Sequence, residues 1–254
     1  MPDRKSPPPF VHSTTFQLIE PVRVTLANAV EVFFIPGGDQ DVLKIELIFQ
    51  AGRWFEKKTG VSQFAANLIS KGTQYRTSFQ IAQIFDRFGA HLEIHPGFDF
   101  VSVSLYTLTH HLDPVLELLI ELITSPVFPD RELVQHRTVF IQNLKVNEEK
   151  TSFLASKEFR KKLFGEDHPY GREIEEHDAG SIDREDILRH YTDFFTRPAV
   201  FVSGKVNEAV RASVIQGFNA LPEGDAKQIS LPADNGSPFK EEIPRDRSIQ
   251  ASIR

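Results

Sequence analysis

The stretch that decides the fold reads Gly60-Val61-Ser62-Gln63-Phe64-Ala65-Ala66-Asn67-Leu68-Ile69-Ser70-Lys71-Gly72-Thr73. This pattern predicts a helix from Gly60 to Ser70, because Lys71-Gly72 is a typical signal for a helix C-terminus. Gln63 and Asn67 are four residues apart, so their side chains share one face of that helix. Both are neutral amides, and the face therefore presents a polar pair without an ionisable group.

Four further segments accompany this helix along the chain: Ala51-Gly52-Arg53-Trp54-Phe55-Glu56, Gly89–Leu105, His168-Pro169-Tyr170-Gly171 and Val200–Val206. In order and spacing, the five landmarks resemble the insulinase/pitrilysin superfamily of zinc peptidases, to which mitochondrial processing peptidase also belongs. The resemblance covers nearly the whole chain. It implies a lobe that occurs in tandem pairs, with pairs of chains enclosing a chamber for unfolded peptides.

The zinc-binding residues of that family are replaced here. The family helix carries His-x-x-Glu-His, whereas this chain has Gln63, Ala66 and Asn67 at the three positions. The family's third ligand is a Glu on a later helix, and the matching position here is Asn143, 76 residues after Asn67. An acidic position seven residues before that ligand is replaced by His136. The resemblance thus identifies Gln63, Ala66, Asn67 and Asn143 as a vestigial site.

The chemistry of these side chains argues against a metal. Catalytic zinc is usually held by three ligands drawn from His, Asp, Glu and Cys, with water in the open position. The amide oxygens of Gln63 and Asn67 are poor substitutes for imidazole nitrogen, and Ala66 has no group that could take a proton from water. We therefore expect no zinc, no other cofactor and no catalysis by this chain alone.

Composition limits the remaining classes of function. The 254 residues include 29 Lys and Arg against 35 Asp and Glu, a net charge of −6, with no run of basic residues. Nucleic acid is therefore not an expected partner. No cysteine is present, which excludes disulfides and thiolate chemistry. Neither a signal peptide nor a membrane-spanning apolar run is seen, so we expect no membrane partner and, by default, a cytoplasmic protein; the periplasm stays open.

Periodicity and turn signals predict the order of elements. Strands are expected at 22–26, 30–35, 42–49, 90–95, 98–107 and 199–203, and helices at 60–70, 78–88, 113–124, 129–149, 152–164, 183–195 and 207–220. The acidic run from Glu173 to Asp178 is interpreted as a solvated loop. This order predicts an α+β fold, a mostly antiparallel sheet with helices packed on one face, as in a metallopeptidase lobe of the processing-peptidase type.

The chain divides into four parts by composition. Residues 1–15 form an extended N-terminal arm, 16–221 the first peptidase-like lobe, 222–246 a linker, and 247–254 an alternating segment that resembles the opening strand of a second, truncated lobe. A lone opening strand would expose an unpaired edge, which favours a fragment of a longer two-lobe protein.

One strand is a candidate for peptide contact. In the family, the strand equivalent to Leu92, Glu93, Ile94 and His95 pairs with substrate by edge addition, which uses backbone groups and needs no catalytic residue. His91 and His95 face the same side of this strand, but their backbones lie about 13 Å apart by rise per residue, too far to share one metal.

Three hypotheses of function follow. The leading one is a non-catalytic peptidase homologue that pairs with an active zinc-peptidase subunit, or with itself, and contributes to binding of unfolded peptides. The second is a structural or assembly subunit, like the core proteins of a respiratory complex. The third is an enzyme with relocated chemistry.

Overall fold

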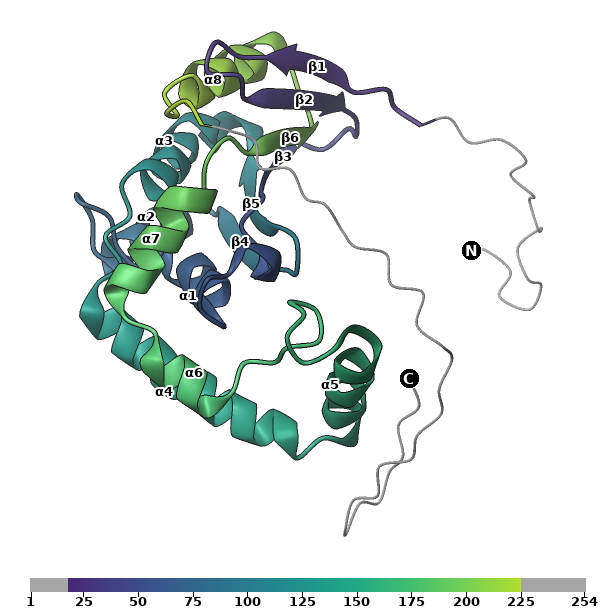
Figure 1. The fold of residues 1–254 in the computed structure, drawn as a ribbon. Helices are drawn as coiled ribbons and strands as arrows, with labels where there is room; N and C mark the ends of the chain where they lie inside the picture. The colour runs from purple at the N-terminus through teal and green to yellow at the C-terminus, as the bar shows by residue number, and fades with distance from the viewer. Residues whose placement is uncertain (1–17, 225–254) are drawn as a thin grey trace, which may run out of the picture.

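A computed structural model describes residues 18–224, and its centre is a six-stranded sheet (Figure 1). The strands, in sheet order, are β1 (Val22–Thr25), β2 (Glu31–Pro36), β6 (Ala199–Gly204), β3 (Val42–Phe49), β5 (Val101–Leu108) and β4 (His91–Pro96). Neighbouring strands are antiparallel except β2 and β6, which run parallel. The predicted mostly antiparallel sheet is confirmed, and β4 lies at one of its edges.

Strand β3 shows why one face of the sheet is covered. Leu43, Ile45, Leu47 and Phe49 alternate with more polar residues along the strand, and all four are buried. Because successive side chains of a strand point to opposite sides, these four form a single apolar row under the helices.

Some helices lie against that buried face, whereas those at Asp130–Glu148, Thr151–Phe164 and Glu176–Ser181 extend away from the sheet (Figure 1). Their bounds are α1 (Val61–Leu68), α2 (Ser78–Arg87), α3 (Leu112–Thr124), α4 (Asp130–Glu148), α5 (Thr151–Phe164), α6 (Glu176–Ser181), α7 (Arg184–Phe194) and α8 (Glu208–Phe218), with short 3₁₀ turns η1 (Arg53–Phe55) and η2 (Thr109–His111). Helix α1 contacts both β4 and α4, and it therefore lies between the sheet edge and the long helix α4.

Local signals explain two of the helix starts. Thr77 caps α2 through the amide of Gln80, whose side chain bonds back to the Thr77 amide. Asp183 and Asp186 form the same reciprocal arrangement at α7. Both starts were predicted from sequence and are confirmed.

The interpretation of the acidic run as a loop holds for residues 173–175 but was wrong for the residues that follow. Residues Glu176–Ser181 form helix α6, and the Glu175 amide donates a hydrogen bond of 2.9 Å to the Asp178 carboxylate. Acidic side chains in the first turn also interact favourably with the positive end of a helix. The charges that suggested a solvated loop therefore begin a helix.

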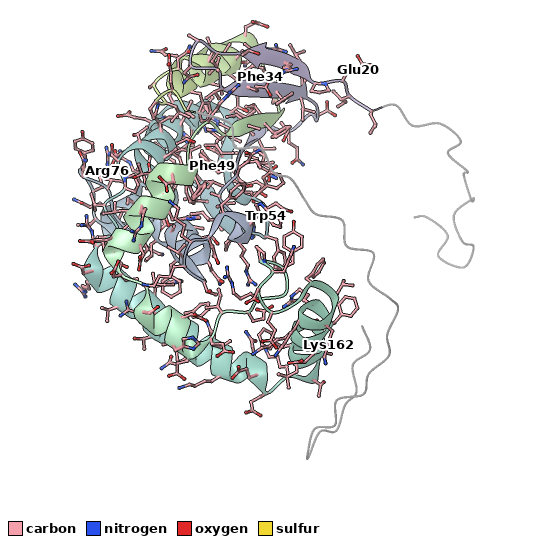
Figure 2. The ribbon with its side chains drawn as sticks, in the orientation of Figure 1. Glu20, Phe34, Phe49, Trp54, Arg76 and Lys162 are labelled. Carbon is pink, nitrogen blue, oxygen red and sulfur yellow. The ribbon has the colours of Figure 1, made fainter. Side chains whose placement is uncertain are left out.

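Phenylalanine, of which the sequence has 22, fills much of the core. Five of them are fully buried: Phe34, Phe49, Phe64, Phe128 and Phe218. Figure 2 places Phe34 and Phe49 within the packed layer, and Trp54 on the side that faces α5. These side chains hold the sheet and helices together as one lobe.

The predicted arm (1–15), the strand at 247–254 and all but the first three residues of the linker (222–246) lie outside the described residues. Within residues 18–224, no helix is long and apolar enough to cross a membrane.

Candidate functional site

Helix α1 begins at a partly buried carboxylate. Gly60 has φ 88°, a left-handed conformation that favours glycine, and turns the chain into the helix. The Glu56 carboxylate accepts hydrogen bonds from the amides of Gly60 (2.9 Å) and Ser62 (3.1 Å) and from the Ser62 hydroxyl. Burial raises the pKa of Glu56, although these hydrogen bonds oppose the rise. Glu56 thus fixes the first turn of the helix that carries the vestigial site.

We expect Glu56→Ala to lower the free energy of unfolding by about 2 kcal/mol, because it leaves amides at a helix start without an acceptor. Glu56→Gln keeps an acceptor oxygen and is expected to cost less than half as much. Urea unfolding at pH 7 measures both. Equal losses in the two variants would show that Glu56 does not act as a hydrogen-bond acceptor.

Of the residues at the family's zinc positions, Asn67 is hydrogen-bonded within its own helix. Ala66 is fully buried, whereas Gln63 and Asn67 are half-buried. The Asn67 side-chain amide donates a hydrogen bond of 2.8 Å to the Gln63 backbone carbonyl. This bond engages one donor of the Asn67 side chain within α1.

Helix α4 packs against α1. The His136 and Phe140 rings pack on Phe64, with centroids 4.8 and 5.4 Å away. Burial, and then the positive charge of Lys71, lowers the pKa of His136, so the ring is neutral near pH 7. Its Nε2 atom is buried and has no hydrogen-bond partner among the described residues. His136 therefore acts as an aromatic packing group between α4 and α1.

Asn143, the position that matches the family's third ligand, has an exposed side chain on α4. The physical reason is that α4 projects from the core: of its residues, Leu133 alone is buried. No hydrogen bond joins Asn143 to Gln63 or Asn67 within residues 18–224. The structure thus groups Gln63, Ala66 and Asn67 on α1, while Asn143 lies on α4, seven residues after the His136 ring that packs on α1.

This donor set does not fit zinc. The four vestigial positions supply three neutral amides and a methyl group, none of which is an ordinary zinc ligand. Among the described residues, no group of three His, Cys, Asp or Glu side chains lies close enough to hold a metal ion.

The predicted contact strand, β4, lies at the sheet edge beside α1. Leu92 and Ile94 pack against the core, so Glu93 and His95 point to the outer side of the sheet. The turn after β4 is held by the segment before α1. The Arg53 amide donates to the Gly97 carbonyl (3.2 Å) and the Trp54 amide to the Phe98 carbonyl (2.8 Å).

The His-Pro-Tyr-Gly turn clamps the same hairpin, a contact that sequence reasoning missed. The Tyr170 hydroxyl donates a hydrogen bond to the Asp99 carboxylate, and its ring packs edge-on against Phe98 and Trp54. Burial, together with Asp99, raises the pKa of Tyr170 to about 12. The His168 ring also packs on Trp54, with the two ring centroids 5.5 Å apart. The sequence signal that could have pointed to this contact is the His-Pro-Tyr-Gly motif, which is one of the five landmarks of the family resemblance.

Comparisons with known proteins agree with this geometry. Residues 38–176 match the model of the insulinase family, peptidase family M16. An uncharacterized zinc protease of Rickettsia felis is 26% identical over 200 residues, 76% of this chain and 48% of that protein. A "probable mitochondrial-processing peptidase subunit beta" of Arabidopsis thaliana is 24% identical over 243 residues, 92% of this chain and 46% of that protein. The chain thus spans about half the length of these relatives.

A solved structure shares the fold. The crystal structure of a peptidase M16 inactive domain from Pseudomonas fluorescens superposes with a TM-score of 0.77 at 23% identity, over 84% of this chain and 54% of that one. The family model covers more than half of the 254 residues, and the landmarks of sequence and structure agree with it. The chain belongs to the insulinase family, peptidase family M16.

Proposed function

We propose that this chain is a non-catalytic member of its family that pairs with an active zinc peptidase and contributes a peptide-binding strand to the shared chamber. The observation that carries the proposal is the contrast between α1 and its surroundings. The helix start, the α1–α4 packing and the hairpin clamp are intact, yet the donors at positions 63, 66, 67 and 143 are amides and a methyl group.

The exposed edge of β4 supports a binding role. Strand addition uses backbone N–H and C=O groups, so it does not depend on the residues that have been replaced. Helix α1 stands beside this edge and would contact side chains of an added peptide. Three further points belong to the same proposal: the chain binds no zinc, its partner is an active zinc peptidase or a second copy of itself, and it lies in the cytoplasm, with the periplasm as the alternative.

The test is co-expression of the chain with a family member from the same genome that retains His-x-x-Glu-His. We expect a stable complex, and a kcat/KM for an unstructured peptide at least about tenfold above that of the partner alone, since a preformed binding strand adds interactions in the transition state. The partner alone at equal concentration is the control. No complex and unchanged activity would overturn the proposal, whereas a complex without stimulation would favour a structural or assembly subunit.

A further inference from the structure

The outer side of β4 carries three ionisable side chains in a row: His91, Glu93 and His95. They share one side because alternate residues of a strand face the same way. His91 Nε2 lies 3.3 Å from Glu93 Oε1, and His95 Nε2 lies 3.5 Å from Glu93 Oε2. Both imidazoles are 69% exposed and the Glu93 side chain is 38% exposed. A carboxylate therefore stands at the open edge of the sheet, held between two imidazoles.

The neighbouring strand supplies no positive charge to match it. The β5 residues opposite His91, Glu93 and His95 are Tyr106, Ser104 and Ser102. Neither β4 nor β5 contains Lys or Arg. On β3, the next strand, the Lys44 ammonium already pairs with Glu46 at 3.0 Å.

Glu93 is also held in its ionised form. Desolvation opposes ionisation, but hydrogen bonds from His95, Tyr106 and His91 outweigh it and keep the pKa of Glu93 below its ordinary value. The Tyr106 hydroxyl lies 3.2 Å from Glu93 Oε2. The outer side of this edge therefore carries a fixed negative charge at neutral pH.

A peptide added to β4 would place one side chain directly opposite Glu93. Directly opposed residues on paired strands lie on the same side of the sheet and interact most strongly, so this side chain would lie next to the carboxylate. The two residues flanking it would point the other way, towards the side on which Leu92, Ile94 and α1 lie. The charge of Glu93 would therefore favour or disfavour a peptide according to the side chain that its register places opposite Glu93.

We infer that Glu93 is a specificity-determining residue that selects extended peptides with Lys or Arg opposite it, flanked by small or apolar residues. This inference rests on the proposed role of β4 as a peptide-binding strand. It adds the chemical class of the peptide, which the exposed backbone edge alone does not define.

Three labelled peptides test it with the full 254-residue chain. Each is an uncharged Ser/Thr/Val ten-residue host with Lys, Gln or Glu at its centre, and binding is followed by fluorescence anisotropy at pH 7.5. We expect the Kd of the Lys peptide to be about fivefold below that of the Gln peptide, and the Glu peptide to bind about fivefold more weakly than Gln, as opposite and like charges across a strand pair predict. Hydrogen–deuterium exchange should slow in residues 91–96 when the Lys peptide binds.

Glu93→Gln should bring the three Kd values within about twofold of one another, because it removes the charge and keeps the shape. Glu117→Gln, which removes an exposed carboxylate on α3, is the matched control and should preserve the order. Equal binding of the Lys and Glu peptides to the native chain, an order that survives Glu93→Gln, or exchange protection outside β4 would overturn the inference while peptide binding stands. If the Gln peptide and the other two all fail to bind, the proposed function of β4 fails as well.

Discussion

Three substitutions, Gln63→His, Asn67→His and Asn143→Glu, are expected to convert this chain into one that binds a single zinc ion. Positions 63 and 67 are one turn apart on one face of α1, which is the spacing that directs two imidazoles to one metal. The third ligand comes from α4, which is held against α1 by the packing of His136 and Phe140 on Phe64. The native side chains lack the donors, while the two helices that would present them are in place.

The gain in stability expected from zinc binding follows from mass action. At a zinc concentration about one hundred times Kd, binding to the folded chain alone adds about 2.7 kcal/mol to its free energy of unfolding. For a lobe of roughly 200 residues, this corresponds to a rise in Tm of about 5–10 °C. The native chain should show no rise, because its amides do not compete with water for zinc. Metal content after dialysis and Tm with and without zinc are the measurements.

The double variant Gln63→His/Asn67→His is the control for geometry. With two ligands from one helix it should bind zinc more weakly than the triple variant, by about tenfold or more, because catalytic sites use three protein ligands. Equal affinity in the two variants would show that position 143 does not face α1. Ala66 is left unchanged because it is fully buried, and a Glu there would bury a carboxylate. The triple variant should therefore bind zinc without hydrolysing peptides.

The sequence predicted α1 and its neighbours because their signals are local. Gly60, the Lys71-Gly72 end of the helix and the capping residues of α2 and α7 act within a few positions of one another. The alternation in β3 likewise set which side chains face the core. Helix α6 was missed because an acidic run is compatible with both a loop and a helix start. The choice depends on the reciprocal bond between Glu175 and Asp178.

Features that depend on distant partners were not accessible in this way. The Tyr170–Asp99 bond joins residues 71 positions apart, and no local signal encodes it. The edge position of β4 follows from the order of all six described strands. Its candidate role came from the resemblance, whereas the charge of its outer side came from the packing around Glu93.

Acid is expected to destabilise the lobe through His190, a residue that no sequence signal singled out. Its side chain on α7 is only 4% exposed, and its Nε2 lies 2.9 Å from the Ala51 carbonyl. That carbonyl is an acceptor, so the neutral ring donates from Nε2. Burial lowers the pKa of His190 to about 4 from an ordinary value of 6.5, although the Ala51 bond and Asp193 oppose the fall. Lys57 adds to it.

Whether acid raises or lowers the free energy of unfolding depends on which state, folded or unfolded, binds the proton. Below about pH 6.5 the unfolded chain is protonated at His190 while the folded chain is not. The stability contributed by the neutral ring is therefore complete above pH 6.5 and is lost as the pH falls towards 4. A shift of this size corresponds to about 3 kcal/mol.

Urea unfolding at pH 7.5 and pH 4 measures this loss in the native chain and in His190→Gln, which can still donate to Ala51 but does not titrate. The native chain should lose about 3 kcal/mol more than the variant over this range. His177→Gln, which removes an exposed imidazole on α6, should behave like the native chain. Equal losses in the native chain and His190→Gln would contradict the prediction.

The effect of acid should extend to β4, the strand proposed to bind peptides. Ala51 directly precedes the segment whose amides hold the turn after β4: Gly52 donates to Asp99 at 3.3 Å and Trp54 to Phe98 at 2.8 Å. Protonation of His190 should therefore release this turn before the rest of the sheet, since local openings need less free energy than global unfolding. Amide exchange in residues 97–100 at pH 4.5 should be faster relative to β3 than in His190→Gln, because in that variant acid adds no charge beneath Ala51. If the turn and β3 open together in both proteins, His190 stabilises the lobe as a whole and does not control the strand.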